Sequence, residues 1–311
     1  MIALVFLIAV NALAFRQAWT MTHYAADGTR TRPSEKLNLG EKMSAVLFGP
    51  SMVRMKNVYT PRRYDLDYST VTFPGYAGLQ LESWRIAGEP GHPVVLLFHG
   101  YCASKDTLLR AANEFHALGC ETWLTDLHGS GGSAGNTTSI GYHEAEDVAA
   151  TVREAIRAQP ASRPLVLYGT SMGAAAILCA VDRKLVQPDA LVLECPFDRL
   201  TTTIGNRFSS MGIPAFPAAG LVVFWCSLQE GFNGFAHNPV RYAGSVRCPT
   251  LLMQGERDEN VGLEHGRAIA AALGDHGAFK VFPGLGHAFL VYDGAAEWRY
   301  AVRNFMDANL R

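Results

Sequence analysis

Ser171 stands between two glycines in the stretch Gly169-Thr170-Ser171-Met172-Gly173. The apolar run LVLYGT leads into this serine and MGAAAILCAV follows it, which predicts a strand that turns directly into a helix. So tight a turn strains the backbone of its central residue, and bulky residues two positions away would collide there. A hydroxyl displayed at the start of a helix is well placed to attack an electrophile. We therefore predict that Ser171 is a catalytic nucleophile.

A serine nucleophile needs a base, and the base needs a carboxylate to orient it. His287 is the candidate base, because it ends the glycine-rich loop GLGH just after the last predicted strand. Asp258 follows the predicted strand PTLLMQ and is the candidate acid. Asp198, after LVLEC, is a rival, and Glu256 and Glu259 lie close to Asp258. The chain order Ser, Asp, His and the position after a strand favour Asp258.

The same chemistry needs hydrogen-bond donors for an oxyanion. The backbone N–H of Met172, directly after the nucleophile, is one candidate. The other is the backbone N–H of Tyr101, in the loop His99-Gly100-Tyr101 that follows the apolar run PVVLLF. Gly100 allows this loop to pass close to the site, and we interpret His99 as a structural residue of the loop.

Strands and helices alternate along most of the chain, which predicts an α/β fold with a mostly parallel sheet. Catalytic groups in such sheets gather where the strands end. Strands are predicted at 68–73, 79–87, 93–99, 121–127, 164–170, 190–195, 249–254 and 279–282. Helices are predicted at 104–118, 142–159, 172–182, 263–273 and 293–310, with helical patches near 38–49.

Composition narrows the class of protein. The 311 residues are 49% hydrophobic and 18% charged, and the formal net charge is −1. This suits one α/β domain with an insertion and leaves no basic field to hold a nucleic acid. Neither the six cysteines nor the glycine-rich stretches match a zinc, dinucleotide or phosphate-loop pattern, so no cofactor or metal is expected. The cysteines are interpreted as free buried thiols, with a disulfide as the alternative in an oxidising compartment.

Residues 1–24 begin with the apolar run MIALVFLIAVNALAF, and Arg16, Trp19 and Tyr24 follow it. We predict a membrane anchor or interfacial helix here. A helix packed on its own domain and a cleaved signal that leaves a secreted or periplasmic protein are the alternatives. Basic residues occur only after the run, which favours a cytoplasmic catalytic domain. Residues 25–64 are predicted as a linker.

Five segments resemble the α/β-hydrolase superfamily in their order and spacing. They are HGY (99–101), DLHGSGGSAG (126–135), GTSMG (169–173), GERDE (255–259) and GLGH (284–287). The likeness covers about residues 65–311 and is greatest to the serine-aminopeptidase and monoglyceride-lipase-like branch. It implies an eight-stranded, mostly parallel sheet flanked by helices, a cap insertion at 198–248 after the sixth strand, and a triad of Ser171, Asp258 and His287. The branch usually has Arg where this chain has His128, in a loop interpreted as structural.

The predicted function is that of a serine hydrolase that cleaves carboxylic esters of acyl or lipid-like substrates through an acyl-enzyme. An amide or thioester hydrolase, including a serine aminopeptidase, is one alternative, and a non-catalytic binding protein on the same fold is another. From 208 to 229 the cap carries no charged residue. It is predicted to line an acyl pocket or to touch the bilayer beside residues 1–24, with plain core packing as the alternative.

Overall fold

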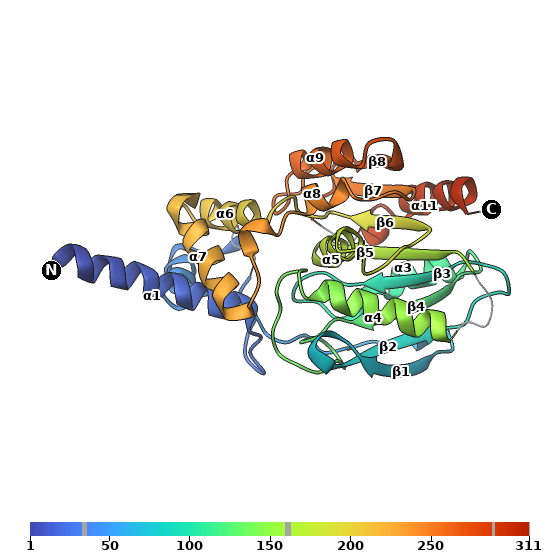
Figure 1. The fold of residues 1–311 in the computed structure, drawn as a ribbon, viewed down its shortest axis with the longest axis horizontal. Helices are drawn as coiled ribbons and strands as arrows, with labels where there is room; N and C mark the ends of the chain where they lie inside the picture. The colour runs from blue at the N-terminus through green and yellow to red at the C-terminus, as the bar shows by residue number, and fades with distance from the viewer. Residues whose placement is uncertain (33–35, 159–162, 288–289, 311) are drawn as a thin grey trace.

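A computed structural model describes residues 1–32, 36–158, 163–287 and 290–310. Its centre is an eight-stranded sheet with the strand order β1-β2-β4-β3-β5-β6-β7-β8 (Figure 1). Only β2 runs against its neighbours, so the sheet is mostly parallel, as predicted. The strands are β1 (Ser69–Pro74), β2 (Gln80–Ile86), β3 (Val94–Phe98), β4 (Glu121–Asp126), β5 (Leu165–Thr170), β6 (Ala190–Glu194), β7 (Thr250–Gly255) and β8 (Gly277–Phe282).

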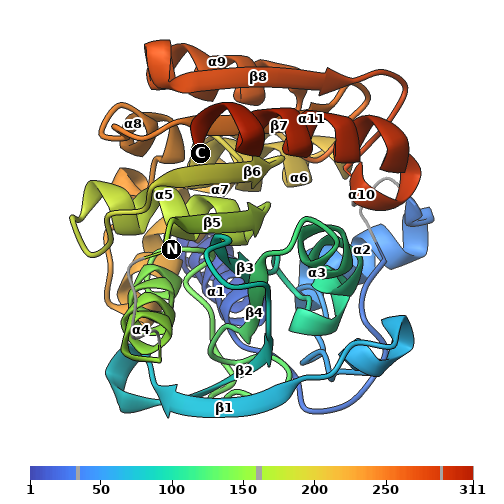
Figure 2. The same cartoon turned by 90° about the vertical axis from the view of Figure 1, so that its right-hand side faces the viewer.

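Helices cover both faces of the sheet, and the strands β3 to β7 are therefore buried on both sides (Figure 2). Residues of α4 (Glu144–Arg157), α5 (Met172–Asp182), α8 (Pro239–Ala243) and α9 (Leu263–Leu273) share one apolar core with one side of the strands. Residues of α3 (Leu109–His116), α10 (Leu290–Asp293) and α11 (Ala295–Asn309) share a second core with the other side. This three-layer arrangement confirms the predicted fold class.

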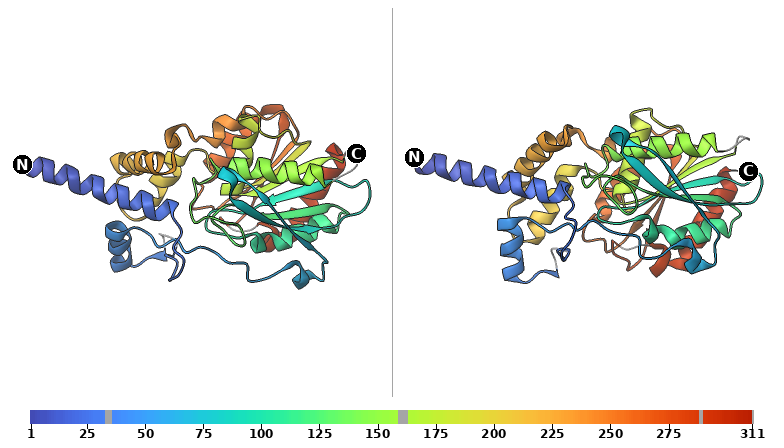
Figure 3. Two further views of the ribbon diagram at one scale, coloured as in Figure 1. Left: turned by 60° about the horizontal axis from the view of Figure 1, so that its bottom comes forward. Right: turned by 90° about the horizontal axis from the view of Figure 1, so that it is seen from below.

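The remaining helices gather at one end of the molecule, away from the sheet (Figure 1, Figure 3). They are α1 (Ile2–Thr22), α2 (Leu39–Phe48), α6 (Leu200–Ser210) and α7 (Ala215–Glu230), and we call this group the helical lobe. Helix α1 packs along α7, and α6 packs against α7. The range predicted as the cap also includes α8, which packs against α5 and α9 beside the sheet.

The helix predicted at 293–310 differs in the structure. A short helix, α10, ends at Asp293, and α11 begins after Gly294. A side chain at Gly294 would come within 2.9 Å of the Phe282 ring, so the chain turns at a residue that has none. The helix predicted at 142–159 begins at Glu144, and its predicted end at 159 lies outside the described residues.

Candidate active site

Ser171 occupies the predicted corner between β5 and α5. Its φ of 49° and ψ of −111° place it in a strained region of backbone space. A Cβ at Gly173 would lie 2.3 Å from the carbonyl oxygen of Phe98, and one at Gly169 would lie 2.6 Å from the backbone of α5. The Ser171 N–H donates to the carbonyl of Glu194 at 2.7 Å, which ties the corner to β6. A side chain at Gly173 would therefore push the corner away from the end of β3, and one at Gly169 would push β5 away from α5.

The structure brings His287 to Ser171. The imidazole Nε2 lies 3.2 Å from Ser171 Oγ, and Nδ1 lies 2.7 Å from Asp258 Oδ2. The His287 side chain is 24% exposed, whereas that of Asp258 is fully buried. Because the carboxylate can only accept, Nδ1 carries the proton in the neutral ring and Nε2 is left to accept one from the hydroxyl.

The Asp258 carboxylate is held by three further donors. Its Oδ1 accepts the backbone N–H groups of Asn260 at 3.0 Å and Val261 at 2.8 Å. Its Oδ2 also accepts from Gln254 Nε2 at 2.8 Å. These bonds fix the carboxylate toward His287.

The rival acid Asp198 faces a different histidine. Its Oδ1 lies 2.7 Å from Nδ1 of His265, on α9. Burial opposes protonation of His265, but the hydrogen bond and charge of Asp198 prevail and raise the pKa of its imidazole. Of the two nearby glutamates, Glu256 accepts the N–H of Gly284 at 2.8 Å in the loop that leads to His287, and Glu259 is exposed.

The two predicted oxyanion donors lie on loops that meet at Ser171. Met172 is the first residue of α5, where a backbone N–H has no acceptor within the helix. A Cβ at Gly100 would lie 3.4 Å from Ser171 Cβ, so the loop that carries Tyr101 passes beside the nucleophile. His99 is buried, which lowers its pKa, and its Nε2 accepts the N–H of Leu127 at 3.1 Å. His99 thus ties its loop to the end of β4.

Sequence reasoning missed that α1 reaches this site. The Tyr101 hydroxyl donates to the carbonyl of Met21 at 2.5 Å, and the N–H of Thr138 donates to the carbonyl of Thr22 at 2.8 Å. The last turn of α1 therefore contacts the loop of the second predicted oxyanion donor. Nothing in the motif pattern points to this contact.

Cys195, Asp258 and His287 offer three potential metal-ligand atoms within 4.8 Å of one another. The thiol is buried, and burial raises its pKa well above the usual value. A protonated thiol is a poor metal ligand, and the carboxylate and imidazole already bond to each other at 2.7 Å. This arrangement fits a proton-transfer line better than a metal site.

The charged residues of the loop at 126–135 are paired with residues of the protein itself. Asp126 pairs with the buried Lys105 at 2.5 Å and accepts the N–H of Gly132. His128 lies 2.5 Å from Asp147, and although burial opposes it, the nearby carboxylates raise the pKa of His128 to about 9. The protonated His128 therefore places a positive charge at the position where the branch that this chain resembles usually has an arginine.

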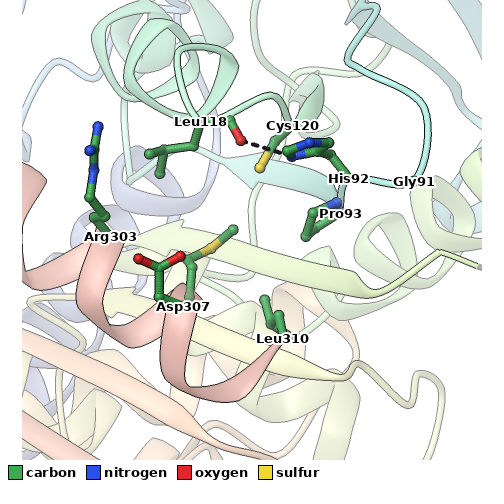
Figure 4. A pocket seen from close by; sticks show the side chains of 9 residues that line it. Gly91, His92, Pro93, Leu118, Cys120, Arg303, Asp307 and Leu310 are labelled. Carbon is green, nitrogen blue, oxygen red and sulfur yellow. Dashed lines mark hydrogen bonds between the residues drawn. The ribbon is translucent and has the colours of Figure 1, made fainter.

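A surface pocket of about 270 Å³ lies at the amino ends of the strands β3 and β4 (Figure 4). His92 and Pro93, just before β3, line it together with Cys120, just before β4, with Arg303 of α11, and with Leu310 just after that helix. It is at the amino ends of the strands, whereas Ser171 follows the carboxyl end of β5. The pocket is therefore separate from the candidate active site.

Comparisons with known proteins agree with this fold. The model of the serine aminopeptidase family S33 matches residues 89–224, which include Tyr101 and Ser171 but end before Asp258 and His287. The uncharacterized protein YqkD of Bacillus subtilis (strain 168) is 21% identical over 245 residues, which are 78% of this chain and 80% of that protein. The protein bem46 of Schizosaccharomyces pombe is 25% identical over 223 residues, 66% of each chain.

Among solved structures, an esterase of Pyrococcus furiosus, Pf2001, is similar in fold. Its TM-score is 0.69 at 21% identity, and the match covers 83% of this chain and 97% of the esterase. This likeness covers a larger share of the chain than the family model does. From the strand order, the strained serine corner and these matches, we conclude that the chain has the α/β-hydrolase fold and that its residues 89–224 resemble the serine aminopeptidase family S33.

Proposed function

We propose that this protein is a serine hydrolase that cleaves carboxylic esters through an acyl-enzyme. One observation carries the proposal: Ser171 Oγ, His287 and Asp258 form a continuous hydrogen-bonded line, with distances of 3.2 and 2.7 Å. Such a line lets a neutral hydroxyl lose its proton as it attacks, while the carboxylate stabilises the imidazolium that results.

In the first half of the reaction, Ser171 Oγ bonds to the carbonyl carbon and its proton moves to His287 Nε2. The carbonyl π electrons move to oxygen, and the N–H groups of Met172 and Tyr101 stabilise that charge. The carbonyl then re-forms, the ester C–O bond breaks, and the leaving alcohol takes the proton from His287. In the second half, water attacks the acyl-serine with the same proton transfers and releases the acid.

The helical lobe favours apolar acyl groups. Helix α7 carries no charge before its last residue, Glu230, and its large side chains Phe216, Phe224 and Leu228 are exposed. The two acids on either side of the uncharged stretch 208–229 have partners that do not suit amine recognition. Asp198 pairs with His265, and Glu230 is mostly buried 3.5 Å from His23. The matching family model is that of a serine aminopeptidase, but none of these contacts of the described residues favours recognition of an amine.

The test is the variant Ser171→Ala, assayed on p-nitrophenyl esters from acetate to laurate. We expect turnover to fall at least about 10³-fold, as losses of triad serines do. Labelling by a fluorophosphonate probe should disappear in the same variant. Ser209→Ala, at an exposed position on α6, is the matched control and should keep both properties.

Undiminished turnover by Ser171→Ala would refute the assignment, and absence of labelling in the wild-type protein would favour a binding protein on the same fold. A matched pair of substrates, an aminoacyl ester and its amide, separates the ester from the amide hypothesis. We expect the ester to be hydrolysed faster.

A further inference from the structure

Helix α1 has two halves with opposite surroundings. Its first half lies outside the body of the protein, with Ile2 86% and Phe6 70% exposed (Figure 1). From Ala14 onward one side of the helix is buried, and Ala18 is completely inaccessible. A single apolar helix therefore serves as a core element at one end and presents bare apolar surface at the other.

Polar side chains fix the second half of α1 to the helical lobe. The buried Gln17 amide donates to the carbonyls of Ala45 and Val46, both at 2.7 Å, at the end of α2. From α7, the Gln229 amide donates to the carbonyl of Phe15 at 3.1 Å. If a signal peptidase removed this helix, the carbonyls of α2 would lose a specific partner. These contacts favour a helix that the mature protein retains.

The last turn of α1 supports the active-site loop. The Met21 carbonyl is among the last four of the helix, and no backbone N–H within the helix donates to these carbonyls. The Tyr101 hydroxyl satisfies this carbonyl at 2.5 Å, and burial raises the pKa of Tyr101 so that the hydroxyl remains a donor. Since the Tyr101 N–H is our second oxyanion donor, the position of α1 bears on the geometry of the reaction.

The outer surface of the helical lobe matches a lipid bilayer. Most large exposed apolar side chains of the described residues are on α1, α2 and α7, and these helices lie together at the end away from the sheet (Figure 3). They are Ile2, Leu4, Val5, Phe6, Leu7, Ile8, Phe15, Trp19, Leu39, Met43, Leu47, Phe48, Phe216, Phe224 and Leu228. The first 60 residues contain seven Lys and Arg against three Asp and Glu, although the whole chain has a net charge of −1. Of these basic residues, Arg16 lies on α1 and Lys42 on α2, and basic residues next to an apolar surface are attracted to anionic lipid.

The length of the exposed half limits how it enters the membrane. The part before Ala14 spans 12 helical residues from Ile2, or about 18 Å at 1.5 Å per residue. The hydrocarbon core is about 30 Å thick, so this part passes the middle of the bilayer but does not cross it. The exposed apolar residues of α2 and α7 would then lie at the interface.

We propose that α1 is a membrane-inserted support of the active site: its apolar first half enters an anionic bilayer from one side, and its last turn holds the loop that carries Tyr101. Membrane binding restrains the same helix that restrains the loop, so turnover rises when the protein is bound to lipid. This rests on the proposed function, because turnover at Ser171 is one of its readouts.

Two full-length variants separate the two ends of α1. Leu4→Glu combined with Phe6→Glu changes only exposed side chains, and we expect it to lose at least ten-fold in co-sedimentation with phosphatidylcholine–phosphatidylglycerol vesicles while it keeps its turnover of p-nitrophenyl acetate in buffer. Tyr101→Phe should bind vesicles like the wild type, but its kcat should fall about five- to ten-fold with little change in KM, because one positioning hydrogen bond is lost. Tyr24 lies beside Tyr101, with the two ring centroids 6.2 Å apart. Its variant Tyr24→Phe is the matched control and should keep its kcat.

Wild-type kcat on the soluble ester should rise several-fold at saturating vesicles, and neither variant should show that rise. Wild-type vesicle binding by the Leu4 and Phe6 double variant would overturn the proposal. So would an unchanged kcat in Tyr101→Phe, or an active cellular form that begins after Thr22. Vesicle binding is measured without turnover, and Ser171→Ala should retain it. Failure of the ester-hydrolase proposal is therefore distinguishable from failure of this one.

Discussion

Gly173→Ala tests whether the serine corner is packed as tightly as the structure indicates. The new methyl carbon would lie 2.3 Å from the Phe98 carbonyl oxygen, 2.7 Å from the Phe98 carbonyl carbon and 2.8 Å from the His99 carbonyl oxygen. These are backbone atoms at the end of β3 and cannot rotate away. An ordinary contact begins near 3.4 Å, so the start of α5 must move from β3 by about 1 Å.

This movement separates the two predicted oxyanion donors, because Met172 starts α5 and Tyr101 follows β3. Loss of one such donor typically costs about 10² to 10³ in kcat, so we expect kcat/KM to fall by about that factor. Overpacking costs typically about 1–3 kcal/mol, partly offset by the better helix propensity of alanine. The melting temperature should therefore fall by only a few degrees, far less than is needed to explain the loss of activity.

The assay compares kcat/KM on p-nitrophenyl butyrate, fluorophosphonate labelling rate and thermal unfolding. Gly220→Ala in α7 is the matched control, because a Cβ there meets nothing within 4 Å. It should keep full activity and gain roughly 0.5–1 kcal/mol in stability from helix propensity. Wild-type activity and stability in Gly173→Ala would refute the packing of the elbow against β3.

Three further predictions follow from the site and its surroundings. Asp258→Asn should lower kcat about 10³- to 10⁴-fold, whereas Asp198→Asn, which faces His265, should change it less than ten-fold; the reverse order would move the acid to the rival position. Burial raises the pKa of Glu194 to about 7, so its contribution to stability is fully present below pH 4.5 and is lost as the pH rises through 7. Glu194→Gln should therefore be more stable than the wild type at pH 8.5, by up to about 3 kcal/mol, with the difference shrinking toward pH 5; urea unfolding that shows a pH-independent difference would contradict this. Burial raises the pKa of all six cysteine thiols, so native protein should react slowly with a thiol-specific disulfide reagent and reveal six free thiols only in denaturant, whereas four or fewer would indicate a disulfide.

The sheet and the serine corner were predictable because their signals are local. A strand buried on both faces is a continuous apolar run, and the strands β3, β5 and β7 each begin within a residue of the predicted position. The corner needs glycines at fixed offsets, and the added Cβ contacts at Gly169 and Gly173 show the physical reason. Parallel strands end at one edge of the sheet, so groups that follow different strands could be expected to meet.

The choice of acid was less certain from sequence, because Asp198 and Asp258 follow the adjacent strands β6 and β7. What separates them is a histidine inside a helix. His265 lies on the buried side of α9, where a sequence shows only another helical position, and it takes up Asp198 at 2.7 Å. Two acid–histidine pairs thus form side by side, and only the side-chain geometry tells which one reaches Ser171.

Hydropathy alone could not divide α1 into its two halves, since most residues in both halves are apolar. Its buried residues do follow a pattern that is visible in the sequence: Ala14, Gln17, Ala18, Met21 and Thr22 lie at the i, i+3, i+4, i+7, i+8 spacing of one helix face. Three of the five are alanine or threonine, small enough for α7 to approach closely. Gln17 on this face has its acceptors on α2, so it marks a side that packs on protein, because lipid offers an amide no partner. The pattern begins only at position 14, and the residues before it, which are apolar except for Asn11, are therefore those left for the bilayer.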